Sequence, residues 1–377
     1  MKRLYKILKY TMIILISTTA LLSLVTIIFL QQPQFGQAAS GERLERMKKS
    51  KHFRDGAFAN LSYTPSLTEG YSMTGVMYNF FFKKNPRQKP LKAIPYIKTD
   101  LKSLPADSNV VVWFGHSSYY MQVDGLKILV DPVFSGNASP LPGTTKAFEG
   151  TNSYGVNDLP EIDYLLISHD HYDHLDYSTI RELKGKVKNV ICGLGVGAYF
   201  EQWGHQPEII SERDWNETIT VGDNIKIHTL TARHFSGRTF RRNTTLWLAY
   251  LIETPGQKIF IGGDGGYDTH FAEIGKRFGT IDLAILENGQ YNLAWRAIHC
   301  LPEEVVQAAK DLNAKRVMPV HSGKFSLALH SWDEPLNEVS RLSKLNDLPL
   351  VTPQIGEVVW MKDEGQVFGE WWKGIES

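Results

Sequence analysis

Short apolar runs and longer amphipathic stretches alternate along the chain from residue 109 onward. An apolar run of about four to eight residues is typical of a strand, whereas apolar positions spaced by three and four indicate a helix. We therefore expect strands at 110–114, 119–123, 126–130, 164–168, 190–192, 225–230, 245–253, 258–261, 283–286, 316–320 and 357–361. Helices are expected at about 178–184, 195–203, 270–277, 303–312 and 333–345. The pattern predicts one mixed α/β domain over residues 106–377.

Two local signals sharpen these boundaries. Asp124-Gly125 separates two apolar runs and is a strong signal for a two-residue hairpin. Pro302 followed by Glu303 and Glu304 is typical of a helix start, because proline fits the first turn and acids stabilise the positive end of the helix dipole. We expect a hairpin and a helix start at these two places.

The N-terminus carries the longest apolar run. Residues 11–30 are uncharged and rich in Leu and Ile, and they follow a basic tail at 1–10. Twenty helical residues span about 30 Å, the thickness of a bilayer hydrocarbon core. A cleaved signal peptide with a cleavage site at 37–40 is the alternative, but the apolar core of such a peptide is usually only about 7–15 residues long. We expect an uncleaved transmembrane anchor at 11–30; in the alternative, the domain is secreted after signal cleavage.

The charges beside the anchor predict its orientation. The basic tail precedes the apolar run and residues 31–41 carry no charge, so the N-terminus should stay in the cytoplasm and the domain should face outward. Residues 31–105 are expected to form a tether and a membrane-proximal, substrate-facing segment. Within it, residues 71–92 join aromatic and methionine side chains to a basic run. This segment fits either an interfacial helix on an anionic bilayer or a helix that covers the core; we favour the second.

Composition narrows the classes of partner. The tail holds four of the 41 basic residues and none of the 40 acidic ones, so the rest of the chain is slightly acidic. Such a domain has no field to hold a polyanion, and nucleic acid is not expected as a partner. Cys192 and Cys300 are too few for a disulfide scaffold and could form one bridge or none. The sequence leaves the oligomeric state open, a homodimer included.

Candidate chemistry concentrates at residues 168–176, which read SHDHYDHLD. This string follows a predicted buried strand, so it lies on a loop that a rigid scaffold holds. In an extended segment His169 and His171 point to the same side and can bind one metal, and a turn then brings Asp173 and His174 toward a second position. Three histidines within six residues are improbable by chance in a chain with 12. Imidazole nitrogens and carboxylate oxygens are ligands that zinc prefers.

Three further ligand candidates, His234, Asp264 and His321, each follow a predicted strand. A single histidine in such a place is more often a hydrogen-bonding residue than a ligand. The glycines at 262–266 could suggest a phosphate-binding loop, but the Lys-Ser/Thr ending and the strand–helix context of a P-loop are missing. The recurrence of three such residues at strand ends favours further metal ligands.

Together these residues resemble the metallo-β-lactamase superfamily. The order His169-x-His171-x-Asp173-His174, followed by His234, Asp264 and His321, matches the order of the metal ligands in that superfamily. More narrowly, the chain is similar to the branch that contains N-acyl-phosphatidylethanolamine-hydrolysing phospholipase D. The matching motifs are Gly115-His116-Ser117-Ser118, residues 129–135, residues 171–176, His234-Phe-Ser-Gly-Arg238, Gly263-Asp264-x-Gly266-Tyr267 and His299-x-x-Pro302-Glu303-Glu304. The similarity covers about residues 50–360.

The resemblance implies a four-layer αββα sandwich with a two-metal site at one edge of its two sheets. One metal would be held by His169, His171 and His234, and the other by Asp173, His174 and His321, with Asp264 bridging. Two zinc ions are expected, although iron or manganese suits the same ligands. His116 and Asp176 would orient ligands, and His299 and Tyr172 would line the substrate pocket. A structural or packing role is the alternative for His116, Asp176 and Tyr172.

The function implied by the resemblance is hydrolysis of a phosphodiester in a phospholipid, of the N-acyl-phosphatidylethanolamine kind, at the membrane. Asp173 and Asp264 would be the catalytic carboxylates, because they hold the metals that turn water into hydroxide. The ligand set also suits a lactone hydrolase acting on a sugar or acyl lactone, since metals polarise carbonyl and phosphoryl oxygens alike. A purely structural metal site is disfavoured, because structural zinc is usually closed by four ligands, often cysteines.

Overall fold

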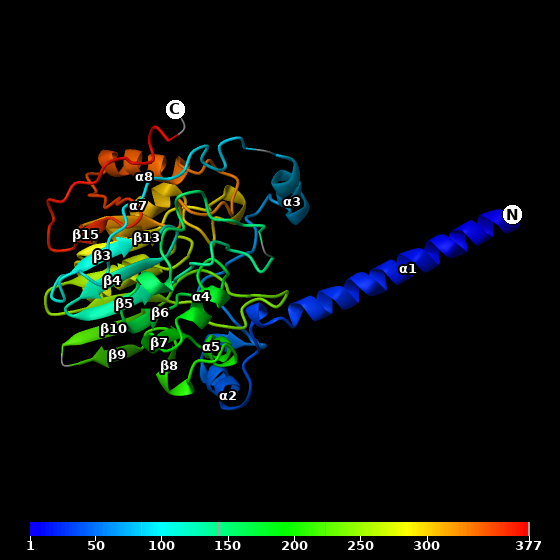
Figure 1. The fold of residues 1–377 in the computed structure, drawn as a ribbon, viewed down its shortest axis with the longest axis horizontal. Coiled ribbons are helices and arrows are strands. Elements are labelled where there is room, and N and C mark those ends of the chain that lie inside the picture. The colour runs from blue at the N-terminus through cyan, green and yellow to red at the C-terminus, as the bar shows by residue number, and fades with distance from the viewer. Residues whose placement is uncertain (84, 142, 223, 376–377) are drawn as a thin grey trace.

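Two β-sheets packed face to face form the centre of the computed structural model, which describes residues 1–83, 85–141, 143–222 and 224–375. Helices cover the outer faces of the sheets, so the domain has four layers (Figure 1). The first sheet has the strand order β15-β3-β4-β5-β6-β7-β8, and the second has the order β14-β13-β12-β11-β10-β9. The αββα sandwich expected from the sequence is confirmed.

The strands and helices have the following bounds. The first sheet contains β3 (Val110–Trp113), β4 (Tyr119–Val123), β5 (Leu126–Val130), β6 (Ile162–Leu166), β7 (Val187–Gly193), β8 (Ile210–Arg213) and β15 (Val358–Trp360). The second contains β9 (Thr218–Val221), β10 (Ile225–Leu230), β11 (Ala249–Glu253), β12 (Lys258–Ile261), β13 (Leu283–Glu287) and β14 (Val317–Val320). The helices of the domain are α4 (Tyr177–Glu182), α5 (Gly197–Gln202), α6 (His270–Phe278), α7 (Pro302–Asp311) and α8 (Glu334–Leu345), with short 3-10 turns η2 (Val156–Asp158), η3 (Pro207–Ile209) and η4 (Leu293–Trp295). Each strand and helix expected from residue 109 onward overlaps one of these elements.

Two strands of the sandwich, β8 and β9, were not predicted from the sequence, nor were the short strands β1 (Phe53–Arg54) and β2 (Ala57–Phe58) that precede it. Both β8 and β9 lie at the edge of their sheets and are only partly buried. An edge strand has one unpaired side and often carries polar residues, and here Ser211, Glu212 and Thr218 interrupt the apolar pattern. The strands are therefore set by pairing with β7 and β10 rather than by a pattern of their own.

Two layers of apolar side chains hold the sandwich together. Trp247, Tyr250 and Phe260 are at most 1% exposed and belong to one continuous core, in which Tyr250 faces the first sheet and Phe260 faces Phe271 of α6 on the outer side of the second sheet. Ile180 of α4 and Phe200 of α5 fill a second layer on the outer face of the first sheet. Burial of one such side chain contributes about 1.5–3 kcal/mol. The sandwich is thus a rigid support for the loops at its edge.

The β4–β5 hairpin turns at Asp124 and Gly125, as the sequence predicted. Val123 pairs with Leu126 across the two-residue loop. Asp124 and Gly125 have φ values of 45° and 85°, and a tight hairpin of the I′ type needs positive φ at both positions. The hairpin fixes β4 beside β3, and the β3–β4 turn carries His116.

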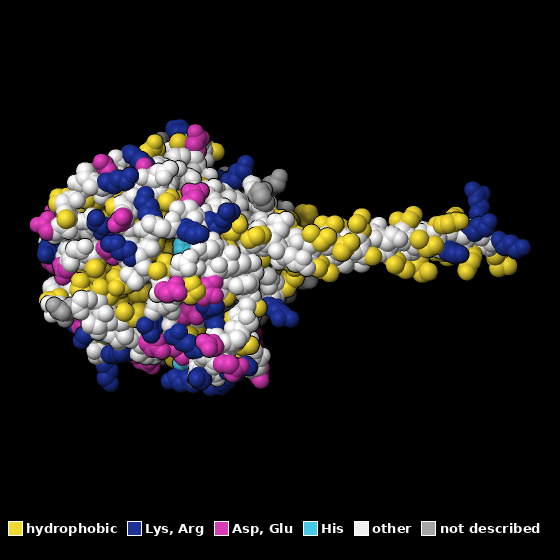
Figure 2. Space-filling view, turned by 60° about the horizontal axis from the view of Figure 1, so that its bottom comes forward, with side chains coloured by type: hydrophobic (Ala, Val, Ile, Leu, Met, Phe, Trp, Pro, Cys, Tyr) yellow, Lys and Arg dark blue, Asp and Glu magenta, His cyan; other side chains and the backbone are white. Residues whose placement is uncertain are grey.

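The N-terminal helix α1 (Lys2–Leu30) extends away from the domain (Figure 1). None of its side chains is buried, and apolar side chains cover it up to a group of Lys and Arg at its free end (Figure 2). By length and composition it could cross a membrane, a test that a signal sequence also passes. The helix begins at Lys2, so the basic residues of the expected tail form its first turns.

Most of the segment that follows lies against the domain. It forms η1 (Pro33–Phe35), α2 (Gly41–Lys49), β1 (Phe53–Arg54) and β2 (Ala57–Phe58). Arg43 of α2 pairs with Glu201 at 2.6 Å and with Glu212 at 2.8 Å. The buried side chains of the segment include Phe35, Met47, Phe58, Ile94 and Leu101. These contacts fix where α1 joins the domain.

The helix α3 (Met73–Phe82) is different, because none of its residues is buried. It lies on the side of the domain from which α1 leaves (Figure 1). The prediction of a helix that covers the core was therefore wrong. Apolar composition shows that a helix can pack, but it does not show whether a core surface is left for it to cover.

Candidate metal centre

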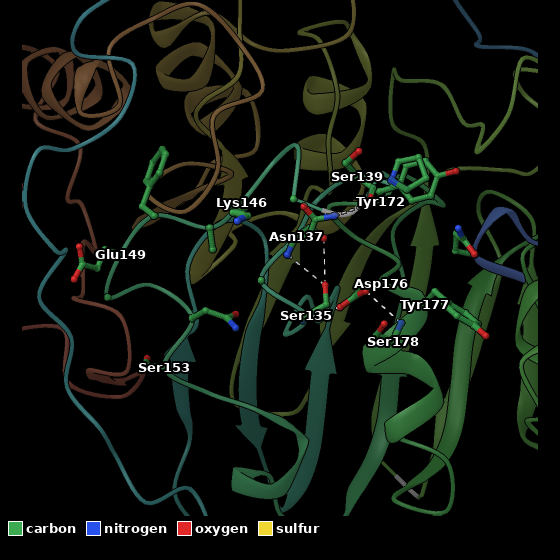
Figure 3. A pocket seen from close by; sticks show the side chains of 18 of the residues that line it. Ser135, Asn137, Ser139, Lys146, Glu149, Ser153, Tyr172, Asp176, Tyr177 and Ser178 are labelled. Carbon is green, nitrogen blue, oxygen red and sulfur yellow. Dashed lines mark hydrogen bonds between the residues drawn. The ribbon is translucent and has the colours of Figure 1, made fainter. Parts of the chain in front are cut away.

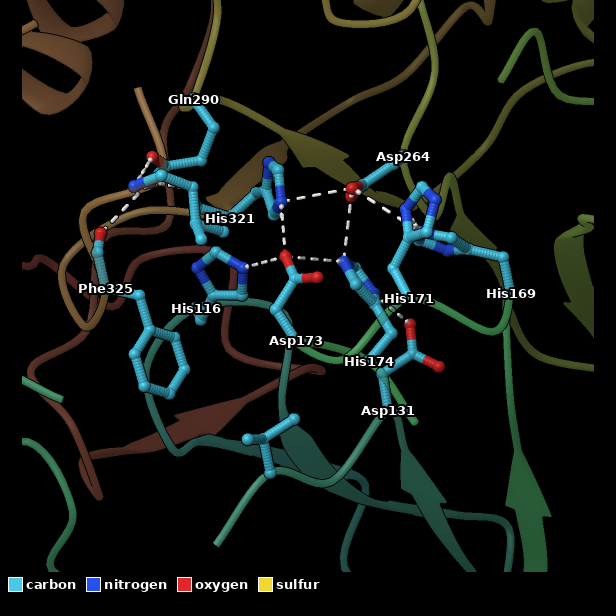
Figure 4. A network of polar contacts seen from close by, with 12 residues as sticks. His116, Asp131, His169, His171, Asp173, His174, Asp264, Gln290, His321 and Phe325 are labelled. Atoms are coloured by element: carbon cyan, nitrogen blue, oxygen red, sulfur yellow. Dashed lines mark hydrogen bonds and ion pairs between the residues drawn. The ribbon is translucent and has the colours of Figure 1, made fainter. Parts of the chain in front are cut away.

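The seven predicted metal ligands lie together at one edge of the sandwich, where loops from both sheets meet (Figure 4). The loop after β6 carries His169, His171, Asp173 and His174. The loops after β10, β12 and β14 carry His234, Asp264 and His321. Every ligand thus follows a strand whose position the sandwich fixes.

Three imidazoles converge in the first group. The Nε2 atom of His169 lies 2.8 Å from Nδ1 of His171, and that atom lies 3.3 Å from Nε2 of His234. These three nitrogens could hold one ion. The other nitrogen of His234, Nδ1, lies 2.9 Å from the carbonyl oxygen of Ile298, which fixes the ring.

The second group is built around the carboxylate of Asp173. Its Oδ2 atom lies 3.5 Å from Nε2 of His174 and 3.4 Å from Nε2 of His321. His116 approaches the same oxygen from the β3–β4 turn, with Nε2 at 2.8 Å. The structure therefore places His116 where it can orient Asp173.

Asp264 stands between the two groups. Its Oδ2 atom lies 3.1 Å from Nε2 of His174 and 3.0 Å from Nε2 of His321. The same oxygen is 3.8 Å from Nε2 of His169 and 3.9 Å from Nε2 of His234. Asp264 therefore faces two imidazoles of each group, which is the position of a carboxylate that bridges two metals.

The donor atoms fit a pair of metal ions. Ligand atoms that each lie about 2.0–2.2 Å from a shared ion are separated by roughly 3–4 Å, and the distances within each group are close to this range. Two atoms aimed into the centre, Nε2 of His174 and Oδ1 of Asp264, are buried and make no hydrogen bond. A buried polar atom without a partner is costly, and a cation would satisfy both.

The electrostatics of the centre agree with this fit. Burial lowers the pKa of His169 and His234 well below the ordinary value and that of His171 to about 4, so these rings are neutral and keep lone pairs for a metal. Burial opposes protonation of His174 and His321, but several carboxylates together outweigh it and raise the pKa of both rings: Asp264 and Asp173 act on both, Asp131 on His174 and Glu287 on His321. The carboxylates thus draw positive charge into the centre, which bound metals would supply.

Two carboxylates that orient ligands were missed by the sequence analysis. Asp131 follows β5, and its Oδ2 lies 2.8 Å from Nδ1 of His174. Glu287 ends β13, with Oε2 at 2.6 Å from Nδ1 of His299 and 3.4 Å from Nδ1 of His321. Their position in the sequence could have identified them, because each follows or ends a buried strand, as the ligands do.

The loops approach each other closely at Gly263. This residue has a φ of +61°, and a Cβ atom there would lie 2.9 Å from Cβ of Ser168 and 3.0 Å from the carbonyl oxygen of Leu248. Glycine therefore lets the loop of Asp264 touch the loop of His169. On the other side, the amide of His321 donates to the carbonyl of His116 at 3.0 Å.

A cavity of about 280 Å³ opens onto the metal centre. Its polar wall includes His171, Asp173, Asp264, His299, His321, Gln290 and Arg242. Its apolar wall includes Leu67, Met73, Val76, Phe80, Phe235, Trp295, Ile298 and Leu327. The structure therefore places His299 beside the metal ligands, in a cavity lined by both polar and apolar side chains.

Tyr172 and Asp176 lie at a different cavity, of about 820 Å³ (Figure 3). The hydroxyl of Tyr172 donates to the carbonyl of Arg238, whose guanidinium lies 4.1 Å from the centre of the tyrosine ring. Asp176 begins α4, and its carboxylate accepts hydrogen bonds from the amides of Ser135 and Ser178. The structure does not bring these two residues to the metal centre, and Asp131 stands where Asp176 was expected.

A fold with two such ligand groups defines a class of protein, the metal-dependent hydrolases of the metallo-β-lactamase fold. Residues 127–322 match the Beta-lactamase superfamily domain, and the chain belongs to that superfamily. An uncharacterised protein of Mycobacterium tuberculosis is 35% identical over 83% of this chain and 85% of its own.

Two relatives are named for the same activity. The N-acyl-phosphatidylethanolamine-hydrolysing phospholipase D 1 of Caenorhabditis elegans is 25% identical over 80% of this chain and 90% of its own. The mitochondrial enzyme of the same name from Saccharomyces cerevisiae is 34% identical over 62% of this chain and 51% of its own.

Solved structures agree on the fold. Igni18, a metallo hydrolase from Ignicoccus hospitalis, superposes with a TM-score of 0.52 at 19% identity over 67% of this chain and 97% of its own. CmlA, a diiron β-hydroxylase from Streptomyces venezuelae, gives 0.53 at 18% identity over 68% of this chain and 55% of its own. At these identities the likeness concerns the fold alone.

Proposed function

We propose that this protein hydrolyses a phosphodiester bond of a membrane phospholipid, of the N-acyl-phosphatidylethanolamine kind, with two zinc ions. The observation that carries the proposal is the cavity at the metal centre, whose lining combines metal ligands and Arg242 with apolar side chains. A phosphodiester next to an acyl chain likewise combines a charged group with an apolar one. The activity of the nematode and yeast relatives supports the same substrate class.

Bound metals would act as Lewis acids that bring the pKa of water from about 15.7 to about 7 and offset negative charge. The ligands of the two groups would hold the metals where they line the cavity. Asp173 and Asp264 would offset the positive charge of the metals with their carboxylates. Arg242 lines the cavity with its guanidinium 4.0 Å from the centre of the Phe235 ring, where it can bind a phosphate oxygen.

His299 is the residue best placed to handle the proton of the leaving group. Its Nδ1 is held by Glu287 at 2.6 Å, which leaves Nε2 for the substrate. Cleavage between phosphorus and the headgroup oxygen produces an alkoxide that needs one proton. Nε2 of His299 can accept the proton that water loses when it becomes the attacking hydroxide, and can pass that proton to the alkoxide. The products are a phosphatidic acid and an N-acylated ethanolamine.

The test is a substrate screen with the full-length, zinc-loaded protein in lipid–detergent micelles. N-acyl-phosphatidylethanolamine should be cleaved to those two products, detected by mass spectrometry, and Asp264→Asn should not cleave it. A protein that leaves this lipid and simpler phosphodiesters untouched would overturn the proposal. Turnover of sugar or acyl lactones alone would instead favour the lactone hydrolase.

Zinc is proposed because the ligand set combines imidazole and carboxylate, which suit zinc but also iron and manganese. The diiron centre named for CmlA makes iron the main competitor. Elemental analysis of protein purified without added metal should give two zinc ions per chain. Two iron or manganese ions per chain would replace zinc in the proposal without changing the ligands.

We also propose that α1 is an uncleaved anchor, with its N-terminus in the cytoplasm and the domain outside. Cysteines introduced at Lys2 and at Val367, which is 88% exposed, provide the test because the native Cys192 and Cys300 are buried. In intact cells a membrane-impermeant maleimide should label Val367→Cys and not Lys2→Cys. The reverse pattern, or a mature chain that lacks residue 2, would overturn the topology.

A further inference from the structure

The helix α3 presents an unpartnered apolar surface. Its large apolar side chains are 45–69% exposed, with Phe81 and Phe82 at the upper end. The helix is nonetheless well formed, because Ser72 caps it by accepting a hydrogen bond from the amide of Gly75 at 3.2 Å. An exposed aromatic surface of this kind marks a site that binds a protein or a membrane.

The position of α3 indicates that its partner is a membrane. The helix lies on the side of the molecule from which α1 leaves the domain (Figure 1). If α1 crosses a bilayer, the surface of that bilayer lies next to α3. The chain then continues with Lys83 and Lys89, both exposed, and aromatic side chains beside lysines are typical of helices that lie at an anionic membrane surface.

One part of α3 also belongs to the cavity of the metal centre. Met73, Val76 and Phe80 form part of its apolar wall, and the Phe80 ring lies 6.3 Å from that of Trp295. Phe81 and Phe82 are not among the residues that line the cavity and are the most exposed large apolar side chains of the helix. One part of the helix thus lines the cavity, and another part is exposed outside it.

We propose that α3 inserts its exposed aromatic side chains into the interface of an anionic bilayer and that Met73, Val76 and Phe80 guide an acyl chain from the bilayer to the metal centre. The insertion follows from the exposed surface and from α1. The guiding role rests on the proposed lipid hydrolysis. The two parts can fail separately, and the measurements below separate them.

Insertion is tested without any reaction. The full-length protein is reconstituted into vesicles of phosphatidylcholine and phosphatidylglycerol, with an environment-sensitive fluorophore on Phe81→Cys or, as the matched control, on Val367→Cys. Lipids that carry a nitroxide near the headgroup should quench the label at residue 81 at least several-fold more than the label at residue 367. Equal quenching would overturn the insertion.

The same labels distinguish a protein partner from a lipid one. If α3 covered a second copy of this chain, labels at residue 81 would transfer energy between copies and would be shielded from the lipid nitroxide. That result would also overturn the bilayer contact. Because no turnover is measured, the outcome does not depend on whether the protein cleaves phospholipids.

The guiding role is tested by kinetics. Phe81→Ser with Phe82→Ser should raise KM for vesicle-borne N-acyl-phosphatidylethanolamine about 5–10-fold, since apolar area leaves the interface, and should leave hydrolysis of a soluble short-chain phosphodiester unchanged. Phe80→Ala should impair the long-chain substrate in detergent micelles as well. Equal effects on short and long chains would overturn the guiding role, whereas absence of all phosphodiester hydrolysis would instead remove the proposed function.

Discussion

Four carboxylates are buried among the imidazoles of the metal centre, namely Asp131, Asp173, Asp264 and Glu287, at 1–8% exposure. A buried carboxylate is costly unless positive charge lies beside it. The imidazoles can supply part of that charge by taking protons, as the raised pKa of His321 indicates. Protonated rings cannot bind metal, so protons and metal ions compete for the same centre.

Asp131 fixes the orientation of His174 by a contact of 2.8 Å. We expect Asp131→Asn to weaken metal binding about 10–100-fold, the usual cost of removing the carboxylate behind a metal-bound imidazole. Competition with a chromophoric chelator measures this affinity. Asp176→Asn is the matched control, because Asp176 caps α4, and it should keep the wild-type affinity. Equal losses in the two variants would contradict the assignment of this role to Asp131.

Lys324 makes the stability of the domain depend on pH. Its Nζ atom is buried and lies 2.9 Å from the carbonyl oxygen of Val133, and burial lowers its pKa to about 7. The pKa in the unfolded chain is about 10.4. Between these values the unfolded chain holds a proton that the folded chain lacks, so the free energy of unfolding should rise with pH, by up to about 1.4 kcal/mol per unit.

Below about pH 7 both states hold the proton, and Lys324 adds no slope. Lys324→Met should remove the rise between about pH 7 and 10. Denaturant titrations of both proteins in the same detergent give the two curves. Curves that run parallel over this interval would show that Lys324 keeps its proton in the folded protein.

At the scale of secondary-structure elements, the loop that follows β12 can approach the loop that follows β6 because residue 263 is a glycine. We expect Gly263→Ala to destabilise the fold by about 1–3 kcal/mol, since the residue has positive φ and its Cβ would meet backbone and side chain. Metal content should fall with it, because Asp264 is displaced. Gly256→Ala is the control, as a Cβ there has nothing within 4 Å. Thermal unfolding and elemental analysis of both variants decide whether the effect is local.

The elements differ in how much of them the sequence could predict. Buried strands such as β6 carry their own apolar run, and the ligands stood out because four of them share one loop. The edge strands β8 and β9 and the orienting residues Asp131 and Glu287 depend on partners distant in sequence, which no local pattern reveals. The exposure of α3 could not be predicted from a local pattern either, because only the assembled domain shows that the core of the domain is already covered.

At the scale of the whole molecule, α1 and α3 lie on the same side of the domain (Figure 1), and part of α3 lines the cavity of the metal centre. The domain carries its core without α1, whose side chains are all exposed or half-buried. Phe29 contacts Phe35 with ring centres 5.0 Å apart, so α1 can be shortened before residue 28 without disturbing that junction. Removal of most of α1 should therefore leave the fold of the domain intact.

We expect a chain that lacks residues 1–27 to unfold at the wild-type temperature and to lose its permanent attachment to membranes. It should still bind vesicles rich in phosphatidylglycerol at low salt through α3 and its lysines, and it should leave them as salt rises, because charge attraction at a surface is screened within about 10 Å at 0.1 M salt. Vesicle flotation at two salt concentrations measures this. Phe81→Ser with Phe82→Ser in the shortened chain should abolish the binding at low salt. A shortened chain that ignores the vesicles at both concentrations would show that α1 alone attaches the protein and that α3 adds nothing to membrane affinity.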